Sequence, residues 1–144
     1  MICYVDTSLL LSILFAEEGS ADAEGAWAGV DHRVSSILLA VESLVVLRRT
    51  HAAAARRLGP VWLADRERAR SELLQEVHLL NVDEGILGTL SLHRELAGCR
   101  ALDAIHLATA VELRDSGFGA DIAIATLDEP MRRLARKLKL RLLL

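Results

Sequence analysis

The 144-residue sequence has few aromatic residues, prolines and cysteines, and each shortage excludes a class of protein. Aromatic residues make up only 3% of the chain, too few for a surface that binds single-stranded nucleic acid by stacking on its bases. With 2 prolines and 9 glycines, the chain is neither collagenous nor of low complexity. Cys3 and Cys99 cannot build a disulfide scaffold and belong to no zinc-binding pattern, so we expect both to be reduced core residues.

The sequence also lacks an excess of positive charge and a long hydrophobic run. Its 17 basic and 20 acidic residues give a net charge of -3, so contact with a nucleic acid requires a local basic patch. The apolar stretch 9–16 contains Ser12 and is shorter than a membrane span. We therefore expect a single domain over residues 1–144 that is cytoplasmic, with no signal peptide and no membrane segment.

Short apolar runs that predict strands alternate with longer runs that predict helices. This alternation predicts an α/β fold with three α/β/α layers, in which helices cover both faces of a central parallel sheet of four to five strands. Ligands of such sheets bind beyond the carboxyl ends of the strands. The expected strands are residues 2–5, 33–35, 77–82 and 122–126, with residues 140–144 as a candidate edge strand.

Helical spacing and capping residues predict the segments between these strands. Thr7 or Ser8 is expected to cap the first helix, and the Arg-rich middle third on both sides of Gly59 and Pro60 is expected to form a helical hairpin insertion. The expected helices are residues 9–16, 21–27, 37–49, the stretch that continues to residue 76, 83–96, 101–114 and 129–137.

Two acidic residues follow apolar strands, where functional side chains of an open sheet gather. Asp6 follows the first strand, and from this position alone it is either a helix cap or a functional residue. Asp128 follows the strand 122–126 in the same way, so the two carboxylates can meet at one edge of the sheet. Asp121 lies at the start of that strand, which places it at the opposite edge.

Two further acids lie on apolar stripes of helices. The residues three and four positions from Glu42 are Leu38, Leu39, Val45 and Val46, and Asp103 shares its stripe with Leu107, Ala110 and Val111. A buried carboxylate costs several kcal/mol unless it is paired, protonated or bound to a metal. His106, three residues after Asp103, is a candidate supporting residue of the same site. The plainer interpretations are that Glu42 points outward from a wholly apolar helix, that Asp103 complements the helix dipole, and that His106 is a packing residue.

Asp6, Glu42, Asp103 and Asp128 come from four separate elements and are expected to converge at the carboxyl edge of the sheet. Clustered carboxylates repel one another, and hard divalent cations such as Mg²⁺ or Mn²⁺ are the usual counter-ions. Such a site suits the hydrolysis of phosphodiester bonds.

Four segments carry a resemblance to a known family: residues 5–8 (VDTS), 39–42 (LAVE), 102–108 (LDAIHLA) and 126–128 (TLD). The sequence resembles PIN-domain ribonucleases of the VapC toxin type over nearly its whole length. The resemblance implies a three-layer fold, an endoribonuclease activity and an acidic site for Mg²⁺ or Mn²⁺ formed by Asp6, Glu42, Asp103 and Asp128. It also implies a homodimer, neutralisation by a small cognate antitoxin, and supporting roles for Thr7 and Thr126.

The loop 114–120 is longer than the family pattern leads us to expect. A shift in the register of the following strand would bring Asp121 rather than Asp128 to the metal. Asp121 is therefore the alternative fourth acid.

Basic residues form two groups that could contact RNA phosphates or an acidic antitoxin segment. For any single arginine, a solvated helix face is the simpler interpretation. One group is Arg132, Arg133, Arg136, Lys137, Lys139 and Arg141, and the other is Arg48, Arg49, Arg56, Arg57, Arg66, Arg68 and Arg70. The apolar helical segments 9–15 and 37–47 independently favour a protein interface and hence a homodimer.

Two other functions fit parts of this pattern. A phosphatase of the haloacid-dehalogenase type also places an aspartate after its first strand, but it normally has a second one two residues later, where this chain has Ser8. An inactive PIN-like or receiver-like binding module would share the fold without the chemistry. Metal titration distinguishes a binding module from a nuclease.

Overall fold

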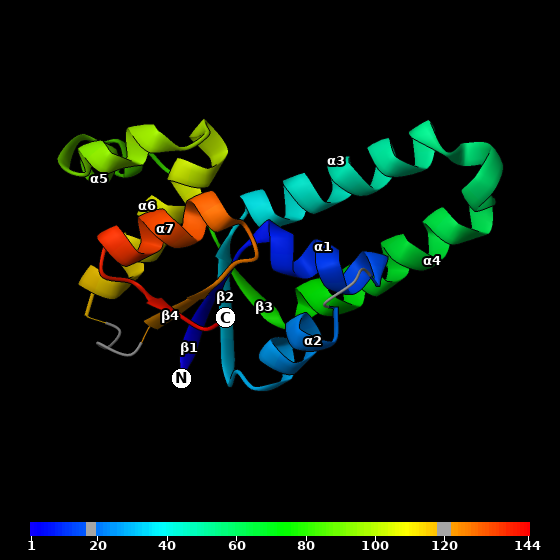
Figure 1. Ribbon diagram of the computed structural model, residues 1–144, viewed down its shortest axis with the longest axis horizontal. Helices are drawn as coiled ribbons and strands as arrows, with labels where there is room; N and C mark the ends of the chain where they lie inside the picture. Colours follow the sequence, from blue (N-terminus) through cyan, green and yellow to red (C-terminus); the bar gives the residue numbers. More distant parts are fainter. Residues whose placement is uncertain (17–19, 118–121) are drawn as a thin grey trace.

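The computed structural model describes residues 1–16, 20–117 and 122–144 (Figure 1). Five parallel strands form one sheet in the order β3-β2-β1-β4-β5. This confirms the predicted fold class, including the fifth strand at the edge. The strands are β1 (Ile2–Val5), β2 (His32–Ser36), β3 (Val77–Leu80), β4 (Ile122–Ala125) and β5 (Arg141–Leu142).

Helices cover both faces of the sheet because alternate residues of its strands are buried on opposite sides. On β1, Tyr4 belongs to one apolar core, whereas Cys3 and Val5 belong to the other. The Tyr4 core includes α5 (Ile86–Leu92), α6 (Ala101–Asp115) and α7 (Glu129–Lys137). The opposite core includes α1 (Thr7–Phe15), α2 (Ser20–Ala28) and part of α4 (Ala55–Gln75).

The predicted helical hairpin is formed by α3 (Leu38–Ala53) and α4, which extend together away from the sheet (Figure 1). The chain leaves α3 at Ala54, and a second break follows at Gly59, whose φ of 73° lies in the left-handed region that favours glycine. Pro60 begins the longer part of α4 directly after this break. The hairpin therefore reverses between residues 54 and 59 rather than at Gly59 and Pro60 alone.

The predicted helix 83–96 is wrong. The structure has only α5 and a separate 3₁₀ helix, η1 (Arg94–Gly98). The Asp83 side chain accepts a hydrogen bond from the backbone N–H of Gly85, so residues 83–85 form a turn. His93, with φ -107° and ψ 77°, then interrupts the helix between α5 and η1.

The first helix is capped by Asp6, not by Thr7 or Ser8 as predicted. The Asp6 carboxylate accepts a hydrogen bond from the backbone N–H of Ser8, so α1 begins two residues earlier than expected. By contrast, α7 has the predicted bounds, because Asp128 caps it by accepting from the N–H of Met131 and a proline occupies its first turn.

Cys3 and Cys99 are both free, as predicted, and burial raises the pKa of Cys3 to about 12. Within the described ranges 1–16, 20–117 and 122–144, no helix combines the length and the apolar character needed to cross a bilayer.

The core beneath α6 can be tested with Leu107→Ala. Leu107 is fully buried, so truncation should lower the free energy of unfolding by about 2–5 kcal/mol, measured by urea denaturation. Leu92→Ala is the control, because Leu92 is 82% exposed and its loss should change stability by less than about 0.5 kcal/mol. Equal effects of the two substitutions would contradict the described packing.

Candidate functional site

The strand ends of β1 and β4 bring Asp6 and Asp128 to one edge of the sheet. Val5 and Ala125 are paired in register, and the backbone N–H of Asp6 donates to the carbonyl of Ala125 at 3.0 Å. Asp6 then caps α1, and Asp128 caps α7. The prediction that the two strand-end acids meet is confirmed, because both line the same pocket.

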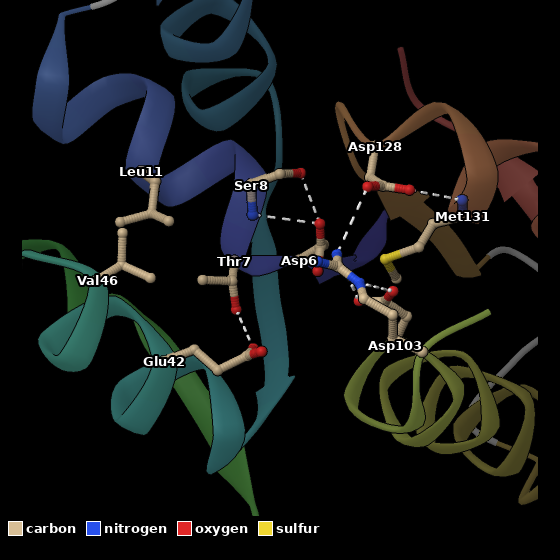
Figure 2. Close-up of a pocket in the computed structure, with 10 residues that line it drawn as sticks. Asp6, Thr7, Ser8, Leu11, Glu42, Val46, Asp103, Asp128 and Met131 are labelled. Carbon is tan, nitrogen blue, oxygen red and sulfur yellow. Dashed lines mark hydrogen bonds and ion pairs between the residues drawn. The ribbon is translucent and has the colours of Figure 1, made fainter. Parts of the chain in front are cut away.

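Helices α3 and α6 bring the other two predicted acids to this pocket. Asp103 lies in the first turn of α6 and is largely buried, whereas the side chain of Glu42 on α3 is 20% exposed. Glu42 therefore does not point into the solvent, which excludes one of the plainer interpretations. Figure 2 shows Asp6, Asp103 and Asp128 close together and Glu42 entering from α3.

The four carboxylates line a pocket of ≈ 240 Å³. Its polar wall is completed by Thr7, Ser8 and Arg100, and its apolar wall by Leu11, Val46 and Met131. Because all four acids face one small volume, their negative charges disfavour one another unless hydrogen bonds or cations compensate.

Hydrogen bonds hold Asp6 by one of its two oxygens. Oδ2 accepts from the Ser8 backbone N–H at 3.2 Å, from Ser8 Oγ at 2.6 Å and from Thr126 Oγ1 at 2.8 Å. Among the described residues, no hydrogen bond reaches the other oxygen, Oδ1. Thr126 therefore hydrogen-bonds a carboxylate of the site, as expected, and Oδ1 of Asp6 is available to a ligand.

Glu42 is held in a similar way. Its Oε2 accepts from Thr7 Oγ1 at 2.7 Å and lies 2.7 Å from Nε2 of the buried His106. Burial alone would raise the pKa of Glu42, but the hydrogen bonds from His106 and Thr7 and the nearby charge of Arg100 outweigh it and lower this pKa. The carboxylate is therefore ionised at neutral pH.

Arg100 supplies the positive charge at the opening of the pocket. Its Nε lies 2.8 Å from Asp103 Oδ2, and its Nη2 lies 3.3 Å from Asp103 Oδ1 and 3.8 Å from Asp128 Oδ2. The guanidinium thus bridges two of the four acids, while 79% of the Arg100 side chain remains exposed. Hydrogen bonding to Asp103 raises the pKa of Arg100 further, so it stays charged.

No group of three His, Cys, Asp or Glu side chains is close enough to hold a metal ion anywhere in residues 1–16, 20–117 and 122–144. Asp121, the alternative fourth acid, and residues 118–120 of the preceding loop lie outside these described ranges. Asp128 is the acid that the structure places in the pocket after β4.

Sequence reasoning missed Arg100 and the role of Ser8. Arg100 precedes α6 with an acid three residues later, and an i, i+3 pair of opposite charge was the available signal. The sequence predicts a capping role for Ser8 and no contact between its hydroxyl and the site. In the structure this hydroxyl bridges Asp6 and the backbone N–H of Leu127. Nothing in a local sequence pattern shows that second contact, because it crosses from α1 to the end of β4.

Comparison with known proteins is consistent with this arrangement. Residues 3–137 match the PIN-domain family. The chain is 35% identical over 121 residues to Ribonuclease VapC45 of Mycobacterium tuberculosis strain CDC 1551 / Oshkosh, and equally to Ribonuclease VapC49 of strain ATCC 25618 / H37Rv. Each alignment covers 81% of this chain and 79% of the relative. This protein therefore belongs to the PIN-domain family and is of the VapC type.

Proposed function

We propose that this protein is a divalent-metal-dependent endoribonuclease and the toxin of a toxin–antitoxin pair. The observation that carries the proposal is the convergence of Asp6, Glu42, Asp103 and Asp128 on one pocket in a chain similar to two ribonucleases. We assign the whole of residues 1–144 to a single domain with this activity.

The pocket supplies carboxylate oxygens, the hard ligands that Mg²⁺ and Mn²⁺ prefer, although among the described residues no three of these side chains lie close enough to hold an ion as they stand. Asp6 Oδ1 and Glu42 Oε1 accept no hydrogen bond from the described residues and are free to bind a cation. Asp103 and Asp128 would complete the ligand set, but their oxygens first have to exchange Arg100 for the metal. The guanidinium marks the position in the pocket where a cation is favoured.

A divalent cation in this pocket would polarise a phosphoryl oxygen and lower the pKa of a bound water. Hydrolysis would form a bond from the water oxygen to phosphorus, break the bond from phosphorus to the ribose oxygen, and transfer a proton from the water to that leaving oxygen. The chain contributes the fixed orientation of the carboxylates, through Ser8 and Thr126 on Asp6 and through Thr7 and His106 on Glu42. Fixed ligands need little reorganisation when the substrate arrives.

Exposed basic and apolar side chains support RNA and a protein as partners. Arg133, Arg136 and Lys137 on α7 are exposed, and guanidinium groups bind phosphates or acidic peptide side chains. Val41 and Val45 on α3 and Ile37 directly before it are exposed and lie four residues apart, so they form an apolar surface. We assign this apolar surface to a homodimer and the pocket opening to a cognate antitoxin, in a cytoplasmic protein.

The nuclease can be tested with purified protein, free of partners, on total bacterial RNA with and without Mg²⁺ or Mn²⁺. Wild-type protein should give discrete fragments only with metal, while Asp6→Asn and Asp103→Asn should lower the rate by about a hundredfold or more. Asp65→Asn is the control, because Asp65 lies in an exposed ion pair on α4 and should leave the rate unchanged. Metal binding without cleavage of any RNA would favour an inactive binding module of the same fold.

The competition between Arg100 and the metal can be measured without RNA. Arg100→Gln removes one positive charge from the acids, so Mn²⁺ should bind about fivefold more tightly by isothermal titration calorimetry, with a smaller gain at high salt. Arg68→Gln is the matched control, since Arg68 also forms an exposed i, i+3 pair but does not line the pocket. Weaker Mn²⁺ binding by Arg100→Gln would contradict competition.

A further inference from the structure

A chain of buried polar groups runs from the pocket into the core between the sheet and α6. It begins at Glu42 Oε2, which lies 2.7 Å from His106 Nε2, and continues from His106 Nδ1 to the hydroxyl of Tyr4 at 2.8 Å. His106 is 1% exposed and Tyr4 is fully buried. The chain thus connects α3, α6 and β1 through one imidazole ring.

The two ends of this chain together indicate the direction of each hydrogen bond, since the Ser36 N–H can only donate and the Glu42 carboxylate can only accept. The backbone N–H of Ser36 can only donate, and it donates to the Tyr4 hydroxyl oxygen at 3.2 Å. Burial raises the pKa of Tyr4 to about 12, so this hydroxyl keeps its proton and is able to donate a hydrogen bond to His106 Nδ1. Ser36 Oγ lies 3.4 Å from the same nitrogen.

An imidazole nitrogen that accepts a hydrogen bond carries no proton, so the neutral ring of His106 carries its proton on Nε2. Nε2 then donates to Glu42, whose ionised carboxylate can only accept. Every donor and acceptor in the chain from Ser36 to Glu42 is matched in this tautomer. The opposite tautomer would place a lone pair of Nε2 against a carboxylate oxygen at 2.7 Å.

His106 and Thr7 both contact Oε2 of Glu42. Within the described part of the chain, the other oxygen of Glu42, Oε1, receives no hydrogen bond. Two donors on one oxygen fix the rotation of the carboxylate and leave Oε1 as its free ligand atom. An apolar residue of similar size at position 106 would fill the same volume without this effect.

We propose that His106 is a positioning residue for the metal site: Ser36 and Tyr4 hold it in the Nε2–H tautomer, and it orients Glu42 so that Oε1 is free to bind the cation. This inference rests on the proposed metal dependence. It separates the role of His106 from that of a buried packing residue, because packing alone requires neither a particular tautomer nor the Tyr4 hydroxyl.

The tautomer can be tested first, on metal-free protein with ¹⁵N-labelled histidine. A long-range ¹H–¹⁵N correlation spectrum should show His106 Nε2 as the protonated nitrogen and Nδ1 as the unprotonated one. Tyr4→Phe should shift this pattern toward a mixture of tautomers, because Nδ1 loses its hydrogen-bond donor. A proton on Nδ1 in the wild-type protein would overturn the inference whether or not a metal binds.

Mn²⁺ affinity then tests the positioning itself. His106→Leu keeps an apolar side chain in the core but donates nothing to Glu42, and it should weaken Mn²⁺ binding about ten- to hundredfold in calorimetry. His106→Gln can return an N–H near the position of Nε2 and should recover most of the affinity. Tyr4→Phe should show a smaller loss, and it serves as the test if His106→Leu does not fold.

The control is Thr109→Val, which replaces another buried polar residue of α6. Among the residues that the structure describes, its hydroxyl donates only to the carbonyl of Ile105, so the substitution should leave Mn²⁺ affinity unchanged. Wild-type affinity in both His106→Leu and Tyr4→Phe, with folding checked by thermal denaturation, would overturn the positioning role. Absence of Mn²⁺ binding to the wild-type protein would instead overturn the proposed function.

Discussion

Repulsion between carboxylates in one small pocket is the constraint on which the rest of the site depends. Each acid is stabilised by different neighbours: Asp6 by Ser8 and Thr126, Glu42 by Thr7 and His106. Asp103 and Asp128 share the guanidinium of Arg100. Asp6, Asp103 and Asp128 also lie at the beginnings of α1, α6 and α7, where the partial positive charge of a helix favours an acid.

Two of these acids also stabilise the fold. Asp6 and Asp128 are helix caps and also line the pocket. The two interpretations of Asp6, as a helix cap or as a functional residue, are therefore compatible. Replacement by Asn retains a good cap and removes the charge, whereas replacement by Ala would remove both. Charge and capping can therefore be distinguished by the choice of substitution.

The sequence could predict the sheet and the four acids for a simple reason. Apolar runs such as Ile2–Val5 are strong local signals for strands. The carboxyl ends of parallel strands lie at one edge of the sheet, so acids that directly follow two such strands lie near each other. The predicted helix 83–96 is wrong because the Asp83 side chain forms a turn with Gly85 and because His93 has a non-helical backbone conformation. The pair Asp83 and Gly85 is a local turn signal that the helical spacing outweighed, whereas the conformation of His93 has no such signal in the sequence.

The partners of the acids were equally out of reach of local pattern. The sequence pattern predicts that Tyr4 is a core residue of a buried strand. In the structure its hydroxyl also hydrogen-bonds His106, 102 positions later in the chain. For Arg100, as for any single arginine, the simpler interpretation of the sequence is a solvated side chain. In the structure it bridges Asp103 on α6 and Asp128 at the N-cap of α7. Contacts of this kind exist only once the sheet has assembled, and no spacing in the sequence encodes them.

The hydrogen bond from Thr126 to Asp6 spans 120 residues, and it forms only after β4 has paired with β1. At a synthesis rate of about 5–20 residues per second, the ribosome makes β1 well before β4 is available to pair with it. A nascent or truncated chain that ends before residue 126 therefore has no complete pocket. Whatever chemistry the pocket performs therefore requires that β4 has been synthesised and has paired with β1.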